Sequence, residues 1–393
     1  MRYNDQTPAV VVGGGINGLG VVRSLGAGGV PVHVLDADHR APAMRSRFAR
    51  AHKAPIIGVE DSLLGALNRL PHRLRGSRPV VLLTTENAVI DAMNDYATLA
   101  QRFRLTLAAP DVLQPALHKN SMRDIARRAG LRVPPTAHVT RMPDLQTLAN
   151  WPMPWIIKPA HRDAAYSRQF DKAYRVDDAA HAATLIQAML EVSKDLIVQQ
   201  WIEGADSDLY FCLQYRPQAG GRTESFVGRK LRSWPPLVGG TASCTQAEGA
   251  DHLVKSTDAF FQEAGIWGLA GMEYKRDKRT GEYVVVEPTV GRTDFQAEVA
   301  TLHGVNIPLA AYHDAAGAPP PTVPNARDGK PRVWREHMSD TSSALASGLS
   351  LDSNPGQAKA VDALFRWNDP GPAAGALIDR IGRRLLKARR FHS

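Results

Sequence analysis

The chain has 393 residues and a formal net charge of +9, from 48 Lys and Arg against 39 Asp and Glu. Its composition, 44% apolar and 22% charged, is typical of a globular protein and excludes a disordered one, and the length predicts two or three domains. Cys212 and Cys244 are the only cysteines, no zinc-type ligand spacing occurs, and no apolar run reaches the roughly 18 residues of a membrane span. We therefore expect no zinc, no disulfide framework, no signal peptide, no stable membrane insertion and a cytoplasmic location.

The first 110 residues alternate strands and helices. The apolar segments 9–15, 30–36 and 78–85 read as strands, and residues 16–29 as a helix closed by glycines. Such alternation predicts a parallel, doubly wound sheet.

A glycine-rich turn follows the first strand. Gly13, Gly15 and Gly18 match the G-x-G-x-x-G spacing, and Asp36 ends the second strand where a ribose-binding acid would sit. The pattern fits a bound NAD or FAD, but the same turn serves any tight strand-to-helix crossover. No residue for hydride chemistry stands out downstream, so an oxidoreductase remains an alternative only.

Two lysines lie on predicted strands of the middle region. Lys158, in WIIKPAH, ends an apolar strand just before Pro159, and Lys172, in FDKAYRV, lies on the returning strand. Each fits either a phosphate contact or a lysine that extends its charge to solvent at a strand end. A short amphipathic helix over 119–130 precedes them.

The segment IVQQWIEGADSD has the composition of an adenosine site. Gln199, Trp201 and Ile202 could supply an apolar slot and backbone groups for an adenine, and Asp206 an acid for a ribose. An ordinary strand-to-turn exit explains the segment equally well.

Two glutamates face each other on the predicted hairpin LAGMEYKRDKRTGEYVVVEP. Glu273 and Glu287 fall opposite or diagonal, about 5–8 Å apart, and would repel each other unless a positive charge lies between them. Magnesium bridging nucleotide phosphates is one solution, since it takes one or two carboxylates. The alternatives are neutralisation by Lys275, Arg276 or Arg292, or a register slip of one residue, which would put the glutamates on opposite faces.

Two further features have open roles. Glu86, at the carboxyl end of a strand, either contacts an amine substrate or caps the following helix, and we favour the cap. After a Pro/Gly-rich linker at 315–331, a basic tail helix carries Leu377, Ile378, Ile381, Leu385 and Leu386 on one face. A solvated helix is the favoured reading, over a cover for the cleft, a dimer contact or a peripheral membrane contact.

The order of these features, over residues 8–315, resembles the ATP-grasp superfamily, and most of all its carboxylate–amine ligases of the D-aspartate ligase type. The resemblance implies an α/β and α+β fold with four segments. These are an N-terminal Rossmann-like domain at 1–110 that holds no dinucleotide, a small lobe at 111–193, a large lobe with the metal site at 194–315, and a linker with a basic helical extension at 316–393.

The resemblance also assigns roles to single residues. Lys119 and Lys158 match the two lysines that contact nucleotide phosphates, Gln199 the reader of the adenine amino group, Trp201 and Ile202 the hinge, and Asp206 the ribose acid. Glu273 and Glu287 match the metal pair, with Thr289 beside them. Lys230, Arg232 and Arg292 match cations at the transferring phosphoryl group, and Lys172 is a further candidate nucleotide contact.

This sequence departs from the family pattern in two places. The usual Glu-x-Asn-x-Arg is here Glu287-Pro-Thr289-Val-Gly-Arg292, with a poorer metal ligand and the arginine one residue later. The loop after Lys158 has no glycine, so it would close over phosphates differently, using Arg162 or Ser167.

The reaction implied is phosphorylation of a substrate carboxylate by MgATP, followed by attack of an amine on the acyl phosphate. The substrates would be small carboxylates and amines, the protein a possible homodimer, and nucleic acid no partner, because no aromatic-interleaved basic stretch occurs. Carboxylation through carboxyphosphate, an NAD- or FAD-dependent oxidoreductase, and a nucleotide-binding regulator without turnover are the alternatives.

Overall fold

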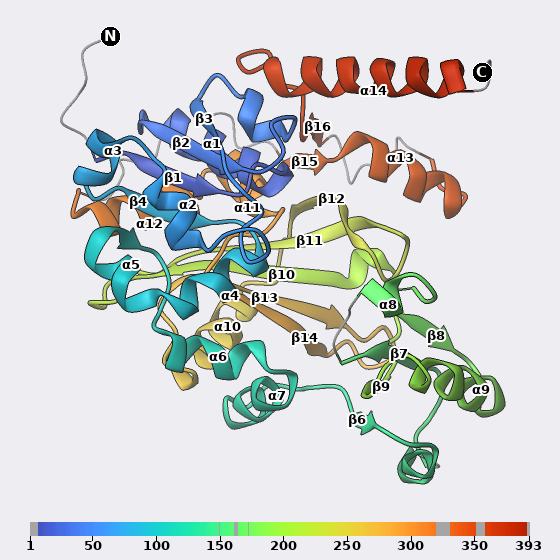
Figure 1. Cartoon of the computed structure of the whole chain (residues 1–393). Helices are drawn as coiled ribbons and strands as arrows, with labels where there is room; N and C mark the ends of the chain where they lie inside the picture. Colours follow the sequence, from blue (N-terminus) through green and yellow to red (C-terminus); the bar gives the residue numbers. More distant parts are fainter. Residues whose placement is uncertain are drawn as a thin grey trace.

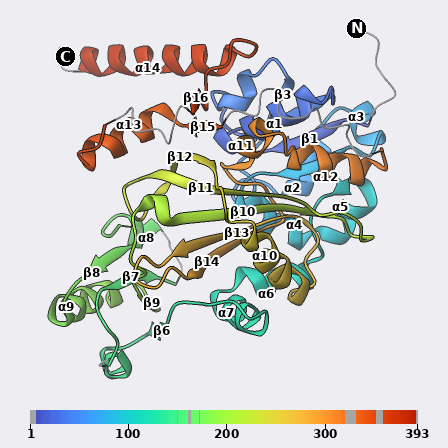
Figure 2. The ribbon, with the colours of Figure 1, turned by 180° about the vertical axis from the view of Figure 1, so that it is seen from behind.

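Figure 1 shows the computed structural model of the chain, which describes residues 7–148, 150–160, 164–171, 173–319, 331–350 and 358–390. Three sheets organise these residues. The N-terminal sheet and the large sheet lie close together, with α11 and α12 between them, and the small sheet projects to one side (Figures 1 and 2).

The N-terminal sheet is parallel, as predicted, and its strand order is β3-β2-β1-β4-β5. Its strands are β1 (Ala9–Val12), β2 (Val32–Asp36), β3 (Ala49–Lys53), β4 (Val80–Leu83) and β5 (Arg104–Leu105). Its helices are α1 (Ile16–Ala27), η1 (Pro42–Arg45), α2 (Leu63–Asn68), α3 (His72–Gly76), α4 (Glu86–Asn94) and α5 (Tyr96–Arg102). The apolar runs of β1 and β4 are fully buried, which is why both lack the polar alternation of a half-exposed strand.

Two helices, α6 (Pro110–Leu117) and α7 (Lys119–Arg128), lead to the small lobe. Its sheet has the order β6-β9-β7-β8, from β6 (Thr136–Val139), β7 (Trp155–Pro159), β8 (Tyr174–Val176) and β9 (Leu196–Gln200). Its helices are η2 (Met142–Leu148), α8 (Ala164–Ser167) and α9 (Ala179–Leu190). The expected boundary at residue 193 is wrong, because β9 pairs with β6 and β7 and so belongs to the small lobe.

The large lobe is built on a seven-stranded sheet of order β14-β13-β10-β11-β12-β15-β16. Its elements from the middle of the chain are η3 (Asp206–Asp208), β10 (Leu209–Arg216), β11 (Glu224–Trp234), β12 (Gly240–Gln246), α10 (His252–Glu263), β13 (Gly268–Arg276), β14 (Tyr283–Val290), α11 (Ala297–Leu302) and α12 (Ile307–Ala316). The C-terminal segment adds β15 (Arg332–Arg335), α13 (His337–Ala346), β16 (Lys359–Asp362) and α14 (Gly371–Arg390).

The C-terminal segment is more than the helical extension expected from the sequence. β15 pairs with β12 and β16 with β15, so both strands extend the large sheet. The tail helix is present as α14, which runs along one edge of the molecule in Figure 1, and Leu377, Ile378 and Ile381 are at least half exposed. Most of the linker at 315–331 lies outside the described residues.

A buried polar network joins the N-terminal domain, α11 of the large lobe and the C-terminal segment. Glu298 on α11 accepts from Trp334 at 2.8 Å, from Arg366 at 2.9 Å and from Arg23 on α1 at 3.5 Å. Arg23 also pairs with the fully buried Asp369 at 2.9 Å. Because each of these charges is buried and paired, separating the C-terminal segment from the N-terminal domain would leave several uncompensated charges.

Candidate active site

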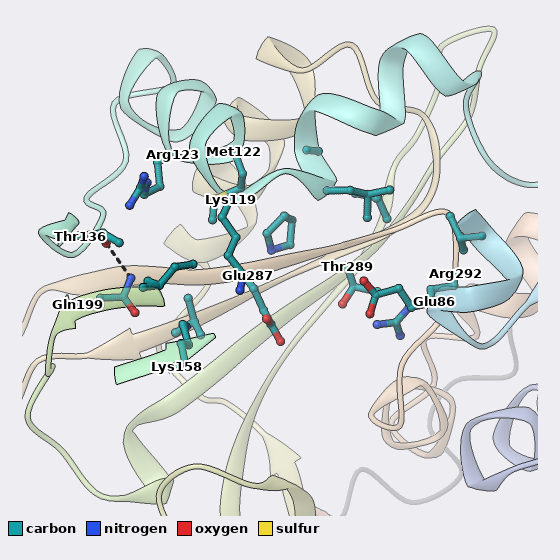
Figure 3. Close-up of a pocket in the computed structure, with 17 residues that line it drawn as sticks. Glu86, Lys119, Met122, Arg123, Thr136, Lys158, Gln199, Glu287, Thr289 and Arg292 are labelled. Carbon is teal, nitrogen blue, oxygen red and sulfur yellow. Dashed lines mark hydrogen bonds between the residues drawn. The ribbon is translucent and has the colours of Figure 1, made fainter. Parts of the chain in front are cut away.

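A cavity of about 150 Å³ opens where the N-terminal domain, α6 and α7, the small lobe and β14 meet (Figure 3). It is smaller than the roughly 300–1,000 Å³ of typical ligand sites, so a nucleotide would extend beyond it. Its polar lining residues are Glu86, Lys119, Arg123, Thr136, Lys158, Gln199, Glu287, Thr289 and Arg292. Six of them are the site candidates Lys119, Lys158, Gln199, Glu287, Thr289 and Arg292, which come from α7, β7, β9, β14 and the loop after β14.

Glu273 and Glu287 are directly paired across β13 and β14. The pairing depends on a bulge: Tyr274 pairs with Val285, so in an unbroken register Glu273 would face Val286. The extra residue in β14 brings Glu287 to the face that carries Glu273, and a bulge is a common way to re-aim a side chain at a site. The predicted pairing of the two glutamates across the hairpin is therefore confirmed, and their role as metal ligands stays a prediction.

Lys230, on β11, supplies a positive charge beside Glu273. Its Nζ lies 2.9 Å from Glu273 Oε1, and the lysine is 5% exposed. Burial alone would lower the pKa of Lys230, but Glu273, with Asp294 and Glu287, more than offsets this and raises it. Burial also raises the pKa of Glu273, and Lys230 opposes that rise. Both directions describe one arrangement, a lysine that stays charged beside a carboxyl group that is easily protonated.

The two predicted phosphate lysines lie at one end of the cavity. Lys119 begins α7 and its Nζ donates to Ala160 O at 3.3 Å, which joins α7 to the end of β7. Lys158, on β7, lines the same end. Arg123, one helical turn after Lys119, was missed by the sequence analysis, although the i, i+4 spacing placed it on the same face. Lys172 lies outside the described residues, as does Arg162 of the loop after β7.

Gln199 points into the cavity from β9. Its Nε2 donates to Thr136 Oγ1 at 3.0 Å across the paired strands β6 and β9 (Figure 3). Gln199 and Thr136 therefore line the same part of the cavity. Thr136 had no signal in the sequence, because its relevance depends on which strand pairs with β9.

The hinge candidates are not among the residues that line the cavity. Trp201 is buried under the Arg175 guanidinium, 5.2 Å from the ring centre, and its backbone N donates to Pro154 O at 3.0 Å. Ile202 is half-buried in the loop after β9. Lys275 donates to the carbonyls of Gly204 and Ala205 at 2.9 and 2.6 Å, so it anchors this loop and does not neutralise the glutamates.

Asp206 is engaged with backbone in this structure. Its carboxylate accepts from Ser233 N and Leu237 N, both at 2.9 Å, and the residue is buried. It therefore holds the turn between β11 and β12, and the structure does not bring it to the cavity. A carboxylate that closes a loop and one that binds a ribose hydroxyl look the same in a sequence.

Arg232 is also placed away from the cavity. It forms a bidentate pair with Asp340 of α13, at 2.7 and 2.9 Å, and both side chains are nearly inaccessible. The expectation that Arg232 lies beside Lys230 at a phosphoryl group does not match this arrangement. A register shift between Lys230 and Arg232 separates the two side chains.

The far end of the cavity carries Glu86, Thr289 and Arg292 (Figure 3). Arg292 Nη1 donates to Thr293 O at 3.0 Å and lies 3.8 Å from Asp294. The expectation that Glu86 caps α4 is wrong. Thr85 is the N-cap and accepts from Ala88 N, while Glu86 lies in the first turn and lines the cavity.

Close packing explains the glycine-rich turn. A Cβ on Gly18 would lie 1.9 Å from Gly13 O, and Asp36 accepts from Gly14 N and from Asp38 N. The side chain of Asn17 donates to Thr84 O and to Thr293 O, both at 2.8 Å, and so joins this turn to the large lobe. These contacts account for the motif without a dinucleotide.

The donor set fits a magnesium ion that arrives with phosphate. Among the described residues no group of three His, Cys, Asp or Glu side chains could hold a metal ion alone. Glu273 and Glu287 are two carboxylates, which is what magnesium takes when water and phosphate oxygens supply the rest. The ammonium of Lys230 already lies against Glu273, which shows that this position favours a cation.

No protein-family model matches the chain, and no curated protein matches it in sequence. Solved structures do resemble it. An N5-carboxyaminoimidazole synthetase from Staphylococcus aureus, complexed with ADP, has a TM-score of 0.62 at 14% identity, over 84% of this chain and 83% of that one. A biotin carboxylase complex from Campylobacter jejuni has a TM-score of 0.63 at 10% identity, over 82% of this chain and 73% of that one.

An L-amino acid ligase from Bacillus licheniformis has a TM-score of 0.56 at 17% identity, over 84% of this chain and 77% of that one. The chain shares its fold with these proteins, and the mixed α/β fold expected from the sequence is confirmed. No described helix of this chain is long and apolar enough to cross a membrane.

Proposed function

We propose that the chain is an ATP- and Mg²⁺-dependent carboxylate–amine ligase of the D-aspartate ligase type, which forms an amide bond and releases ADP and phosphate. One observation carries the proposal. A carboxylate pair set by a strand bulge, Glu273 and Glu287, lies beside a buried lysine and a cavity that bears cations from a second lobe. The nucleotides named for two similar structures agree with an ATP site in this fold.

In the first step a carboxylate oxygen of the substrate attacks the γ-phosphorus of ATP. The O–P bond forms as the bond to the β-phosphate oxygen breaks, and ADP leaves. Lys119 and Lys158 would hold the α- and β-phosphates, and Gln199 would read the adenine edge, with the hinge at Trp201 and Ile202 beside it. Lys230 and Arg292 would balance the charge on the transferring group.

In the second step a neutral amine attacks the acyl carbon. The C–N bond forms, the C–O bond to phosphate breaks, and the amine proton passes to solvent. Glu273 and Glu287, with Thr289 beside Glu287, would hold magnesium, which when bound neutralises phosphate charge and orients the β- and γ-oxygens. Arg232 and Asp206 would act indirectly, by fixing β11 and the turn that follows it.

The test is phosphate release from MgATP with pooled amino acids and carboxylic acids, with ADP separated from AMP and hydroxylamine added to trap an acyl phosphate as its hydroxamate. We expect ADP, phosphate and hydroxamate that depend on a carboxylate, lost in Lys158→Met and retained in Lys359→Met, an exposed lysine of β16 outside the cavity. AMP and pyrophosphate would replace the acyl-phosphate mechanism with adenylation.

A second candidate is carboxylation through carboxyphosphate. It is favoured by the names of the similar synthetase and biotin carboxylase structures. Bicarbonate, with no organic carboxylate, would then stimulate ADP release, and an amine would not be needed for it.

A further inference from the structure

Helix α14 is held against the N-terminal domain by small residues and a carboxylate. Asp379 pairs with Arg45 of η1 at 3.0 Å, and a Cβ on Gly375 would lie 1.9 Å from Arg45 Nη1. Pro372 and Gly375 are buried, and Asp379 is half-buried. These three residues are spaced three and four apart, so they form one stripe of the helix, and this stripe faces the body of the molecule.

The apolar residues of α14 lie outside this stripe. Leu377 is 60% exposed, Ile378 68% and Ile381 50%. They share one helical face, whereas Leu385 and Leu386, predicted on the same face, lie beyond the part of α14 whose side chains are described. A surface helix of a globular protein normally buries its apolar face, and α14 does the opposite. The solvated helix favoured from the sequence does not explain this orientation.

Two aromatic side chains are exposed in the segment that leads into α14. Trp367 is 90% exposed and Phe365 40%, and their rings meet edge to face with centres 5.0 Å apart. Arg366, between them, turns inward and donates to Glu298 at 2.9 Å, which fixes the segment. Tryptophan favours the boundary between an apolar phase and water, because its ring is apolar and its N–H is polar.

The charge around this apolar face is positive. The basic residues in the sequence of α14 are Arg380, Arg383, Arg384, Lys387, Arg389 and Arg390. Its one acid, Asp379, is already paired. Two acids of the preceding segment are also engaged, since Asp369 pairs with Arg23 and Asp362 accepts from two backbone N–H groups. An anionic partner is therefore favoured.

We infer that α14 and the segment before it dock on the surface of an anionic lipid bilayer. Leu377, Ile378 and Ile381 enter the headgroup region together with Trp367, and the positive charge of the helix is attracted to the lipid phosphates. A second copy of the chain would bring two positively charged helices together, and a nucleic acid would leave the apolar residues in water.

Docking on a bilayer leaves the candidate active site open. α14 runs along the edge of the molecule opposite to α7 and β9, which line the cavity, and both views show this arrangement (Figures 1 and 2). The inference goes beyond the proposed function and does not depend on it, so its test needs no turnover.

The experiment is sedimentation of the full chain with vesicles of phosphatidylcholine, either alone or with about 30 mol% phosphatidylglycerol, at salt concentrations of about 0.05 M and 0.5 M. The variant is Leu377→Gln with Ile378→Gln. The control is Val59→Gln, which changes a valine that is 75% exposed in the N-terminal domain. Brominated phosphatidylcholine quenches tryptophans that enter the bilayer, and Trp367→Phe isolates this residue among the seven of the chain.

We expect binding to the anionic vesicles at low salt, about 10-fold or more weaker at high salt or on the neutral vesicles. The double variant should lower the partition coefficient about 10-fold or more, because two buried aliphatic side chains are lost from the contact, and Val59→Gln should behave as wild type. Quenching by the brominated lipid should disappear in Trp367→Phe.

Absence of binding to anionic vesicles at low salt, or equal binding of the wild type and the double variant, would overturn the inference. Analytical ultracentrifugation of the same proteins tests the other occupant of the face. A dimer that the double variant dissociates, without vesicle binding by the wild type, would overturn the inference and assign the face to a second copy of the chain.

Discussion

Two buried ion pairs start from the same strand, two residues apart. Each joins a basic side chain to a carboxylate, but they connect different parts of the molecule. Lys230 of β11 reaches across the sheet to Glu273 on β13, whose partner strand β14 carries Glu287 into the cavity. Arg232 reaches the other way, to Asp340 on α13 in the C-terminal segment. One pair belongs to the candidate site and the other joins two parts of the fold.

A backbone irregularity separates them. Residues two apart on a regular strand share a face, so Lys230 and Arg232 should point together. In β11 Lys230 pairs with Cys244 and Arg232 with Ser243, which leaves Leu231 as an extra residue and turns Arg232 toward α13. The difference teaches that a charge on a strand acquires its role from the register, and residue type alone does not decide it.

The largest effect should come from Lys230→Met. Loss of a preorganised cation at a transferring phosphoryl group costs about 10²- to 10³-fold in turnover. It also leaves Glu273 as an unpaired buried charge, so we expect a loss of about 3–5 kcal/mol in stability, partly restored by Mg²⁺ with ADP. Steady-state kinetics and urea unfolding, each with and without MgADP, measure both. Turnover within a few-fold of wild type would remove Lys230 from the site.

The matched variant on the other pair is Arg232→Met. It leaves the buried Asp340 unpaired, so we expect a similar loss of about 3–5 kcal/mol in the free energy of unfolding. Turnover per folded molecule should stay within about two-fold of wild type, because neither partner lines the cavity. If turnover fell as far as in Lys230→Met at full folding, Arg232 would contact the phosphoryl group after all.

The pH dependence of turnover should show the role of the Lys230–Glu273 pair through a smaller and reversible effect. Burial raises the pKa of Glu273 above its ordinary 4.5, with Glu287 and Asp294 adding to the rise. A carboxyl group whose pKa is raised by folding stabilises the folded state below pH 4.5, and this stability is lost as the pH rises through the folded-state pKa. At neutral pH Glu273 is therefore ionised at a cost, which its ion pair with Lys230 offsets. The raised pKa of Lys230 keeps that partner charged until the pH exceeds 10.5.

On acidification Glu273 therefore takes up a proton before an ordinary glutamate does. We expect the acid limb of kcat/KM for MgATP to lie above pH 4.5, and Asp294→Asn to move it down, since that variant removes a nearby negative charge. The measurement is a pH–rate profile of wild type and variant on folded protein. An acid limb below 4.5, or one that Asp294→Asn moves up, would contradict the assigned direction.

Much of this arrangement could be predicted from the sequence, and the failures have a common cause. Buried apolar runs predicted β1, β4 and β14, and the hairpin predicted that Glu273 and Glu287 would meet. Arg232 and Asp206 were misplaced, and Thr136 was missed, because strand pairing, a bulge and loop closure decide which way a polar side chain points.

The smallest effect is expected where both members of a pair are replaced. In Arg232→Met with Asp340→Leu no charge is left buried, and such replacements are often neutral, so stability should return to within about 1 kcal/mol of wild type with turnover intact. The corresponding change at the site, Lys230→Met with Glu273→Leu, should also fold but should not turn over. Urea unfolding and phosphate release, measured on the single variants Lys230→Met and Arg232→Met and on the two double variants, distinguish a pair that acts in turnover from one that only stabilises the fold. If the Arg232 and Asp340 double variant folded well and lost turnover, the pair would be part of the active site, and Lys230 and Arg232 would no longer differ in role.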